Sequence, residues 1–249
     1  MSYTASMVSL NVARPSCPRW ALRTLPALLL VMVPLAGWSQ IRSTSKTLKA
    51  SRPKLYDAKV SYLIFQGSSP LVRFANAAIA REARGDFNQF VKYAKERAKE
   101  TQKFGMTWER DQSMVVVQAT PTLISVYFQA YDFSGGAHPN HYLAPLNFAL
   151  VNGRPKQLKL KDLVKNPKLL MDGPVLIRLN EIKKDSGAAP ESTINPAVYD
   201  SFVITPTALT WMFQPYAVGA YTEGEFEIKV PFNELRGYFR ADSPVGRAR

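Results

Sequence analysis

The sequence predicts an α+β fold in which antiparallel sheets are each covered by helices. Three patterns support this prediction: one long amphipathic helical stripe, a series of alternating strand-like runs with short polar or proline punctuation, and a second helical section followed by a hairpin pattern. Segregated helices and strands of this kind are typical of α+β proteins. With 249 residues and 46% hydrophobic content, the chain has ample material for a packed core.

The first 39 residues have the composition of a secretory signal peptide. They contain three arginines and no acidic residue, followed by an apolar stretch over residues 25–38. This stretch is short and interrupted by proline, whereas a membrane-spanning helix needs about 20 apolar residues. We therefore expect cleavage near Ser39 and Gln40 and an extracytoplasmic (periplasmic or secreted) product. The alternative is an uncleaved leader that tethers the protein to the membrane.

Composition narrows the chemistry of the mature chain. The only cysteine, Cys17, lies in the predicted signal peptide, so disulfides, thiolate catalysis and zinc–thiolate sites are excluded from the mature chain. The formal charge of +13 falls to +10 once residues 1–39 are removed, because they carry three arginines and no acid. The basic residues are dispersed, which favours a solvated surface over a specific nucleic-acid site.

The elements of the first half follow in order. Residues 40–54 are rich in Ser, Thr, Lys and Arg without an apolar period, and predict a flexible tether. Residues 56–65 alternate and predict a strand. Ser69 as N-cap and Pro70 at the first position begin a helix that we expect to extend to about residue 103, with Gly85 as a point where it could break.

An antiparallel meander and a hairpin are expected next. The predicted strands are residues 106–110, 113–119, 123–133 and 141–150. Asn152-Gly153 predicts a tight hairpin turn, with residues 157–160 as the return strand.

The C-terminal half is predicted to combine helices with a second small sheet. The expected elements are helical segments at 161–164 and 169–183, a loop at 186–190, strands at 202–205, 209–213 and 225–230, and a short helix at 233–239.

The strand over 123–133 ends in the sequence Ser-Gly-Gly-Ala-His-Pro-Asn. Gly135 and Gly136 are expected to form a structural turn, since glycine adopts positive φ without steric cost. We expect His138 and Asn140 to hydrogen-bond with backbone groups of this turn.

The order of three segments resembles the RsiV-like family of extracytoplasmic domains. They are YDFSGGAHPN (131–140), LNFALVNGRPKQLKLKDLVKNP (146–167) and FVITPTALTWMFQPYAVGAYTEGEFEIKVPFNEL (202–235). This two-part module is also found in PdaC-type peptidoglycan deacetylases and in lysozyme-sensing anti-sigma factors. The resemblance implies two small intertwined subdomains, a PdaC-type N-terminal subdomain at 55–140 and an RsiV-like C-terminal subdomain at 141–241, followed by a tail at 242–249.

The resemblance also implies a sensing or binding role at the bacterial envelope. The chain lacks a polysaccharide deacetylase domain, and only about 20 residues precede its apolar stretch, too few for a cytoplasmic sigma-binding domain. We find no nucleophile elbow, phosphate loop or dinucleotide fingerprint. The leading hypothesis is a non-enzymatic binding module without cofactor that recognises a peptidoglycan-like cell-wall glycan or a lysozyme-like protein.

Two groups of residues are candidates for the ligand site. Tyr216 and Tyr221 lie in a predicted loop, where tyrosine offers a large amphipathic contact; the alternative is that they cover a sheet edge. His138, Asn140 and His141 form the second group. With a carboxylate such as Asp132 or Glu223, the two histidines would instead suit a metal-assisted cell-wall hydrolase or deacetylase. Four Cys or His ligands are usual for structural zinc, and this set has two, so we predict no metal site.

Overall fold

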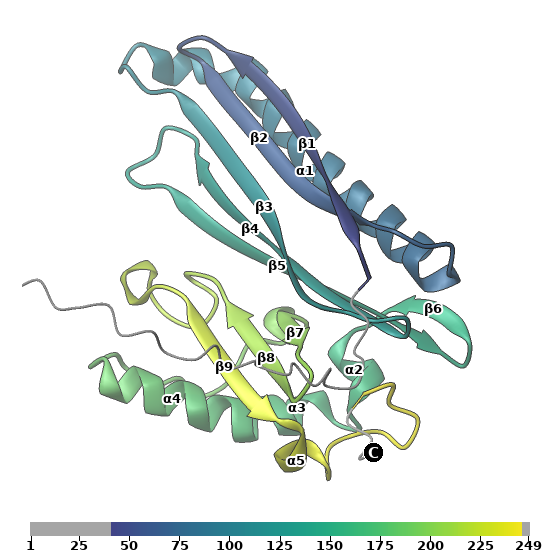
Figure 1. Ribbon diagram of the computed structural model, residues 1–249. Coiled ribbons are helices and arrows are strands. Elements are labelled where there is room, and N and C mark those ends of the chain that lie inside the picture. Colours follow the sequence, from purple (N-terminus) through teal and green to yellow (C-terminus); the bar gives the residue numbers. More distant parts are fainter. Residues whose placement is uncertain (1–40, 246–249) are drawn as a thin grey trace, which may run out of the picture. The chain divides into compact units, whose positions relative to one another are not determined.

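A six-stranded sheet crossed by one long helix forms the first half of the structure (Figure 1), a computed structural model that describes residues 41–245. The predicted signal peptide therefore lies outside the described residues. The strands adjoin in chain order: β1 (Ser43–Arg52), β2 (Tyr56–Phe65), β3 (Trp108–Ala119), β4 (Leu123–Phe133), β5 (Asn140–Val151) and β6 (Arg154–Gln157). Together with a second, three-stranded sheet, this confirms the α+β class.

Helix α1 (Pro70–Gln102) covers one face of this sheet. It begins as predicted, since the Ser69 side chain accepts a hydrogen bond from the Val72 N–H and Pro70 occupies the first turn. The helix continues through Gly85 without a break. Its inward stripe packs on β2 to β5, and the buried residues of the helix include Leu71, Val72, Ala75, Ile79 and Phe90.

One strand pair departs from the antiparallel prediction. Strands β2 and β3 are parallel, with Tyr56 opposite Trp108 and Val60 opposite Gln112. The physical reason is the length of α1, which at about 1.5 Å per residue carries the chain back past the whole sheet. The following strand therefore starts at the same end as β2, as in other crossover connections. The two runs predicted at 106–110 and 113–119 form the single strand β3.

The predicted flexible tether is wrong, because most of residues 40–54 form strand β1. This strand pairs with β2 along its full length, from Ser43 opposite Phe65 to Arg52 opposite Tyr56. It lies at the edge of the sheet and most of its side chains are exposed. An edge strand held by backbone hydrogen bonds needs no apolar alternation, so composition alone gave no signal.

The Asn152-Gly153 hairpin forms as predicted. Both residues have positive φ, 50° for Asn152 and 74° for Gly153, which suits a two-residue turn between antiparallel strands. It joins β5 to β6, whose residues 154–157 begin directly after the turn rather than at the predicted position 157.

The second half packs helices against a smaller antiparallel sheet. Its strands are β7 (Phe202–Ile204), β8 (Ala208–Phe213) and β9 (Phe226–Pro231), in that order. Its α-helices are α2 (Leu160–Leu163), α3 (Pro167–Leu170), α4 (Leu176–Asp185) and α5 (Phe232–Leu235). The segment Met171–Val175 joins α3 to α4 through a kink at Gly173, whose backbone is not helical. The large buried side chains Trp211, Phe202 and Phe213 lie in this core.

The two halves share strand β5 and a buried polar network. The face of β4 and β5 opposite α1 presents Ser125 and Asn147, whose side chains hydrogen-bond to each other at 2.7 Å. Asn147 donates to the Phe202 carbonyl, and the Ile204 N–H donates to Ser125. The predicted subdomain boundary between residues 140 and 141 falls at the start of β5, and the described residues form one compact unit.

The first residues of the predicted tail are packed rather than free. Ser243 and Val245 are buried, and Val245 belongs to the core of the second half. Residues 246–249 lie outside the described part of the chain. Among the described residues, no helix has the length and apolar character needed to cross a membrane.

Candidate functional site

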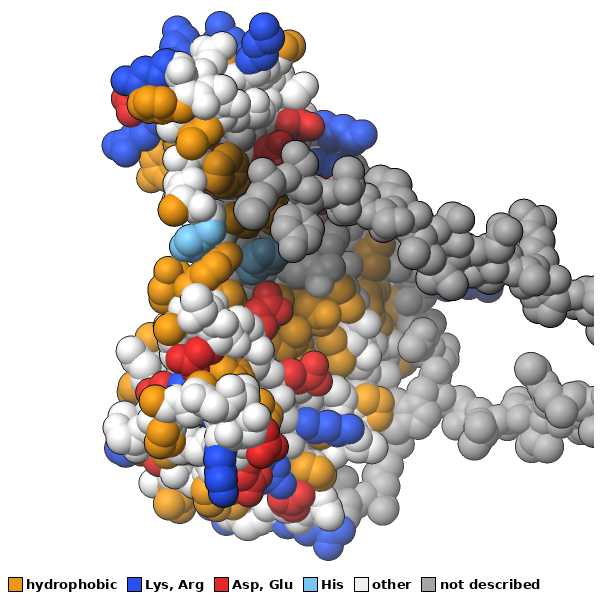
Figure 2. Space-filling view, turned by 90° about the vertical axis from the view of Figure 1, so that its left-hand side faces the viewer, with side chains coloured by type: hydrophobic (Ala, Val, Ile, Leu, Met, Phe, Trp, Pro, Cys, Tyr) orange, Lys and Arg blue, Asp and Glu red, His pale blue; other side chains and the backbone are white. Residues whose placement is uncertain are grey.

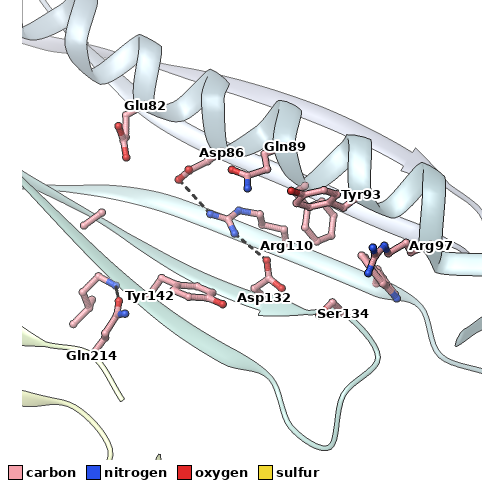
Figure 3. Close-up of a pocket in the computed structure, with 14 residues that line it drawn as sticks. Glu82, Asp86, Gln89, Tyr93, Arg97, Arg110, Asp132, Ser134, Tyr142 and Gln214 are labelled. Carbon is pink, nitrogen blue, oxygen red and sulfur yellow. Dashed lines mark hydrogen bonds and ion pairs between the residues drawn. The ribbon is translucent and has the colours of Figure 1, made fainter. Parts of the chain in front are cut away.

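A cleft of about 650 Å³ lies between α1 and the adjoining face of β3, β4 and β5 (Figure 3). We call it the α1 cleft. It is lined by charged, aromatic and small side chains, namely Glu82, Asp86, Gln89, Phe90, Tyr93, Arg97, Trp108, Arg110, Asp132, Ser134, Tyr142, Leu143, Ala144 and Gln214. A concave surface with aromatic walls and a few convergent polar groups is the usual form of a ligand site.

Strand register places the polar groups of the cleft. Arg110 on β3 lies directly opposite Asp132 on β4, and Asp132 lies opposite Asn140 on β5. Successive side chains of a strand point to opposite faces, so Arg110, Asp132 and Tyr142 share the face that α1 covers. Gln214 follows β8 in the second half and also lines the cleft. Its side-chain oxygen accepts a hydrogen bond from the Leu143 N–H of β5 at 3.2 Å.

Arg110 organises the centre of the α1 cleft. Its Nη1 donates to Asp132 Oδ2 at 2.9 Å and its Nη2 donates to Asp86 Oδ2 on α1 at 3.2 Å. Gln112 accepts from the same guanidinium at 2.8 Å, and the Tyr142 ring lies 5.9 Å from the guanidinium carbon. The arginine side chain is only 12% exposed, so its charge is balanced by protein groups rather than by water.

Three groups in the cleft titrate above their ordinary range. Burial raises the pKa of Asp132, and the hydrogen bond and charge of Arg110 oppose this rise. Burial and the neighbouring Asp86 charge raise the pKa of Glu82, whereas Arg81 lowers it. Burial and the Asp132 charge raise the pKa of Tyr142. These directions describe a partly desolvated cleft with an excess of negative charge.

A second cluster joins three of the predicted ligand residues, which we call the His138 cluster. The rings of His138 and Tyr221 stack with their centroids 3.9 Å apart, and the Tyr216 ring lies 5.4 Å from that of Tyr221. The Tyr221 hydroxyl donates to the Pro139 carbonyl at 2.7 Å. Figure 2 shows histidine side chains at the surface of this side of the molecule, bordered by hydrophobic side chains.

Tyr216 has an unusual backbone for an exposed tyrosine. Its φ is 70° and its side chain is 63% exposed. A left-handed conformation costs a non-glycine residue about 1–2 kcal/mol. Such strain persists where the surrounding structure holds it in place, often at ligand sites.

Within the His138 cluster, His138 also bonds within the turn, with Nδ1 2.9 Å from the Pro139 oxygen. The two remaining predicted residues take other positions. Asn140 lies opposite Asp132, on the face of β5 that α1 covers. His141 points to the opposite face, where its ring meets Tyr131 at a centroid distance of 5.8 Å. The five predicted residues therefore do not form one site, because neighbours along a strand point to opposite sides.

The carboxylates considered as partners of the histidines are engaged with cations. Asp132 pairs with Arg110, and Glu223 Oε2 lies 3.0 Å from the buried Lys183 Nζ. In the part of the chain that the structure describes, no group of three or more His, Cys, Asp or Glu side chains is arranged to hold a metal ion.

The predicted glycine turn needs its first glycine. Gly135 has a φ of 83°, and a Cβ there would lie 2.6 Å from Thr101 Cγ2 at the end of α1. Gly136 has no positive φ, and the nearest atom to its added Cβ is 3.8 Å away. The turn therefore depends on Gly135, and the predicted need for Gly136 is not supported.

Sequence reasoning missed most of the α1 cleft. Glu82, Asp86 and Tyr93 were not among the predicted ligand residues. Arg110 and Asp132 could have been found from the sequence. Each is a charged residue in a strand, and the alternation of side chains along the strand places it on the face that also carries the apolar core residues. Their pairing, however, depends on the register of two strands 22 residues apart.

Two solved structures have a similar fold. A DUF3298 family member from Bacteroides fragilis matches with a TM-score of 0.57 and 13% identity, covering 82% of this chain and 96% of that chain. A DUF3298 family protein from Pseudomonas aeruginosa PAO1 matches with a TM-score of 0.51 and 15% identity, covering 81% and 96%. At these identities the similarity concerns the fold alone. This fold defines the class, a mixed α+β domain.

Family models make the assignment more specific. Residues 50–141 match the family described as Deacetylase PdaC, and residues 133–233 match the protein of unknown function DUF3298. The chain therefore has the two-part organisation indicated by its sequence, a PdaC-type part followed by a DUF3298-type part. The two matches overlap at the turn between β4 and β5. No curated protein matches the chain.

Proposed function

We propose that this protein is an exported, non-enzymatic binding module of the bacterial cell envelope, and that its α1 cleft holds a peptidoglycan-like cell-wall ligand. The observation that carries the proposal is the cleft itself, in which the exposed rings of Tyr93 and Tyr142 stand beside charged hydrogen-bonding groups. Sugar rings present apolar C–H faces and polar hydroxyls, and tyrosine offers matching apolar faces with a polar tip.

A binding role fits the chemistry of the cleft better than catalysis. Arg110 pairs with both Asp86 and Asp132, so two of the three carboxylates are held as acceptors for an arginine. A general acid or base must be free to exchange a proton with the ligand. The alternative, a metal-assisted hydrolase using His138 and His141, would require Asp132 or Glu223 to leave its cation, which supports the non-enzymatic proposal.

The leader supports an extracytoplasmic location. Under this proposal the chain is cut near Ser39 and Gln40, and the mature protein begins just before β1. N-terminal sequencing of the protein recovered from the periplasm or medium tests the cleavage. A product that keeps its leader and stays with the membrane fraction would favour a tethered form.

Binding to soluble peptidoglycan fragments tests the function directly. We expect Tyr142→Ala and Tyr93→Ala each to weaken binding about tenfold, which corresponds to ~1.4 kcal/mol, in isothermal titration calorimetry. Phe104→Ala is the matched control, since Phe104 is 69% exposed but does not line the cleft. The proposal would be refuted if the wild-type protein bound none of the peptidoglycan fragments.

A lysozyme-like protein is the second candidate partner, and the His138 cluster is the observation that favours it. Exposed tyrosine is enriched among residues that dominate protein–protein binding. In the same experiment with lysozyme as the titrant, Tyr216→Ala would then weaken binding while Tyr142→Ala would have the smaller effect. Binding of lysozyme and not of peptidoglycan fragments would assign the protein partner.

A further inference from the structure

The α1 cleft carries opposite charges at its two ends. Glu82 lies near one end and Arg97 near the other, on the same helix, with Tyr93 between them (Figure 3). Fifteen residues separate Glu82 from Arg97 along α1. At about 1.5 Å per residue the two positions are about 22 Å apart along the helix axis. The cleft is therefore long and polarised rather than a round pocket.

The one cation at the centre is already engaged. Arg110 is shared between Asp86 and Asp132, and its guanidinium also donates to Gln112. Among the described residues that line the cleft, Glu82 and Arg97 form no ion pair. Asp86, held by one contact of 3.2 Å, lies one helical turn from Glu82. A ligand would thus meet an unpaired carboxylate at one end and an unpaired guanidinium at the other.

The middle of the cleft suits a chain of alternating polar and apolar groups. Phe90, Trp108 and Ala144 supply apolar surface between the two charged ends, and Tyr93 and Tyr142 supply hydroxyls. A cleft of about 22 Å accommodates about six residues of extended peptide, at 3.3–3.6 Å each. A single sugar or a small metabolite would fill only part of it.

We propose that the α1 cleft binds the peptide stems of its cell-wall ligand in one direction, with an ammonium group at Glu82 and Asp86 and a carboxylate at Arg97. This inference rests on the proposed function and narrows it, because it assigns specificity to the charged peptide rather than to the sugar backbone. Arg97 suits a carboxylate through bidentate hydrogen bonds, and a carboxylate pair suits an ammonium. The opposite orientation would place like charges together at both ends.

Chemical modification of the ligand, combined with matched variants, tests the orientation. The probe is a cross-linked muropeptide whose free side-chain amine and free C-terminal carboxylate belong to different peptide stems, so that the two charges can lie about 22 Å apart. It is titrated into the mature protein by calorimetry. Two derivatives remove one charge each, by acetylation of the amine or amidation of the carboxylate. The variants are Glu82→Gln and Arg97→Gln, both at exposed positions of α1 where folding should be retained.

The expected result is selective coupling. Acetylation of the amine should weaken binding to the wild-type protein about threefold to tenfold, yet leave binding to Glu82→Gln almost unchanged. Amidation of the carboxylate should behave likewise toward Arg97→Gln. Glu96→Gln and Arg84→Gln are controls that remove the same charges from α1 outside the cleft, and both modifications should keep their full effect on these variants.

Three outcomes would overturn the inference. If the peptide-free disaccharide binds as tightly as the muropeptide, recognition lies in the sugar and the proposed function stands without this refinement. If each modification weakens binding to Glu82→Gln and Arg97→Gln as much as it weakens binding to the wild-type protein, these two residues do not recognise the charges of the ligand. If neither disaccharide nor muropeptide binds, the proposed function itself fails and this inference fails with it.

Discussion

Arg110 determines the electrostatics of the α1 cleft at the scale of single residues. Asp132 is 13% exposed and Asp86 is 31% exposed, and one guanidinium forms ion pairs with both carboxylates. Removing one partner from a largely buried ion pair costs more than the pair contributes, because the remaining charges are left without compensation. The arginine therefore holds the strand β3, the strand β4 and α1 in one arrangement.

Arg110→Met is expected to lower the free energy of unfolding by about 2–4 kcal/mol at neutral pH. Burial already raises the pKa of Asp132, so its ionised form costs folding stability, and stability is regained as the pH falls through that raised pKa. Without Arg110 the pKa rises further. The difference between variant and wild type in urea unfolding should therefore shrink between pH 7 and about pH 4.5.

A double variant checks this explanation. Arg110→Met with Asp132→Asn removes the uncompensated charge, so it should recover part of the lost stability and lose most of the extra pH dependence. Equal losses at both pH values, or no recovery in the double variant, would show that Arg110 acts through packing alone.

Gly135 tests the turn between β4 and β5. Gly135→Ala places a methyl group on a residue with a φ of 83° and 2.6 Å from Thr101, so we expect a loss of about 1–3 kcal/mol in thermal or urea unfolding. Gly136→Ala is the matched control. The nearest atom to its added Cβ would lie 3.8 Å away, at an ordinary contact distance, so this variant should change stability little. Similar losses in the two variants would contradict the assignment.

At the scale of elements, the loop between β8 and β9 presents Tyr216, Tyr221 and Gln214. Lys183 on α4 anchors this loop, because its Nζ lies 2.8 Å from the Val218 carbonyl oxygen and 3.0 Å from Glu223 Oε2. Burial alone would lower the pKa of Lys183, but hydrogen bonds with Glu191 and Glu223 outweigh it and raise the pKa. The lysine thus stays charged although it is only 1% exposed.

Lys183→Met is expected to destabilise the fold by about 2–4 kcal/mol, because Glu191 and Glu223 lose their common cation. Hydrogen exchange should increase first in residues 214–224, where the loop loses its anchor. Lys184→Met, at the exposed neighbouring position, should change neither stability nor exchange. Faster exchange spread evenly over the whole chain would argue against a specific anchor.

Elements were predictable where the signal is local. The N-cap at Ser69, the stripe of α1 and the Asn152-Gly153 turn each depend on residues within a few positions of one another, and all three form as expected. Strand β1 was missed because an exposed edge strand has the composition of a linker. The parallel pairing of β2 with β3 depends on where the end of α1 delivers the chain, which no local pattern encodes.

At the scale of the whole molecule, a small polar network connects the two halves. Ser125 and Asn147 are almost fully buried and link β4 and β5 to the backbone of β7. Buried polar groups of this kind stabilise a structure only while each keeps its partner. We therefore expect the two halves to unfold as one cooperative structure rather than independently.

Asn147→Leu is expected to cost about 2–4 kcal/mol, since it leaves the Phe202 carbonyl and the Ser125 hydroxyl without their partner. Wild-type protein should unfold in one calorimetric transition, and the variant should show broadened or separate transitions for the two halves. Gln129→Ala is the control, because it removes an exposed cross-strand hydrogen bond with Ser113. A single sharp transition in both variants would indicate that the halves are coupled elsewhere.

The sequence by itself determined the α+β class, the long helix, most strands and the two-part family resemblance, because periodicity, caps and turn residues act over short stretches of chain. Only the tertiary structure decided the candidate site. Arg110 meets Asp132 across 22 residues and Asp86 across 24, and Tyr221 meets Pro139 across 82. Contacts over such separations depend on strand register and on the path of α1, and a one-residue shift in the register of β3 or β4 would point Arg110 or Asp132 to the other face of the sheet.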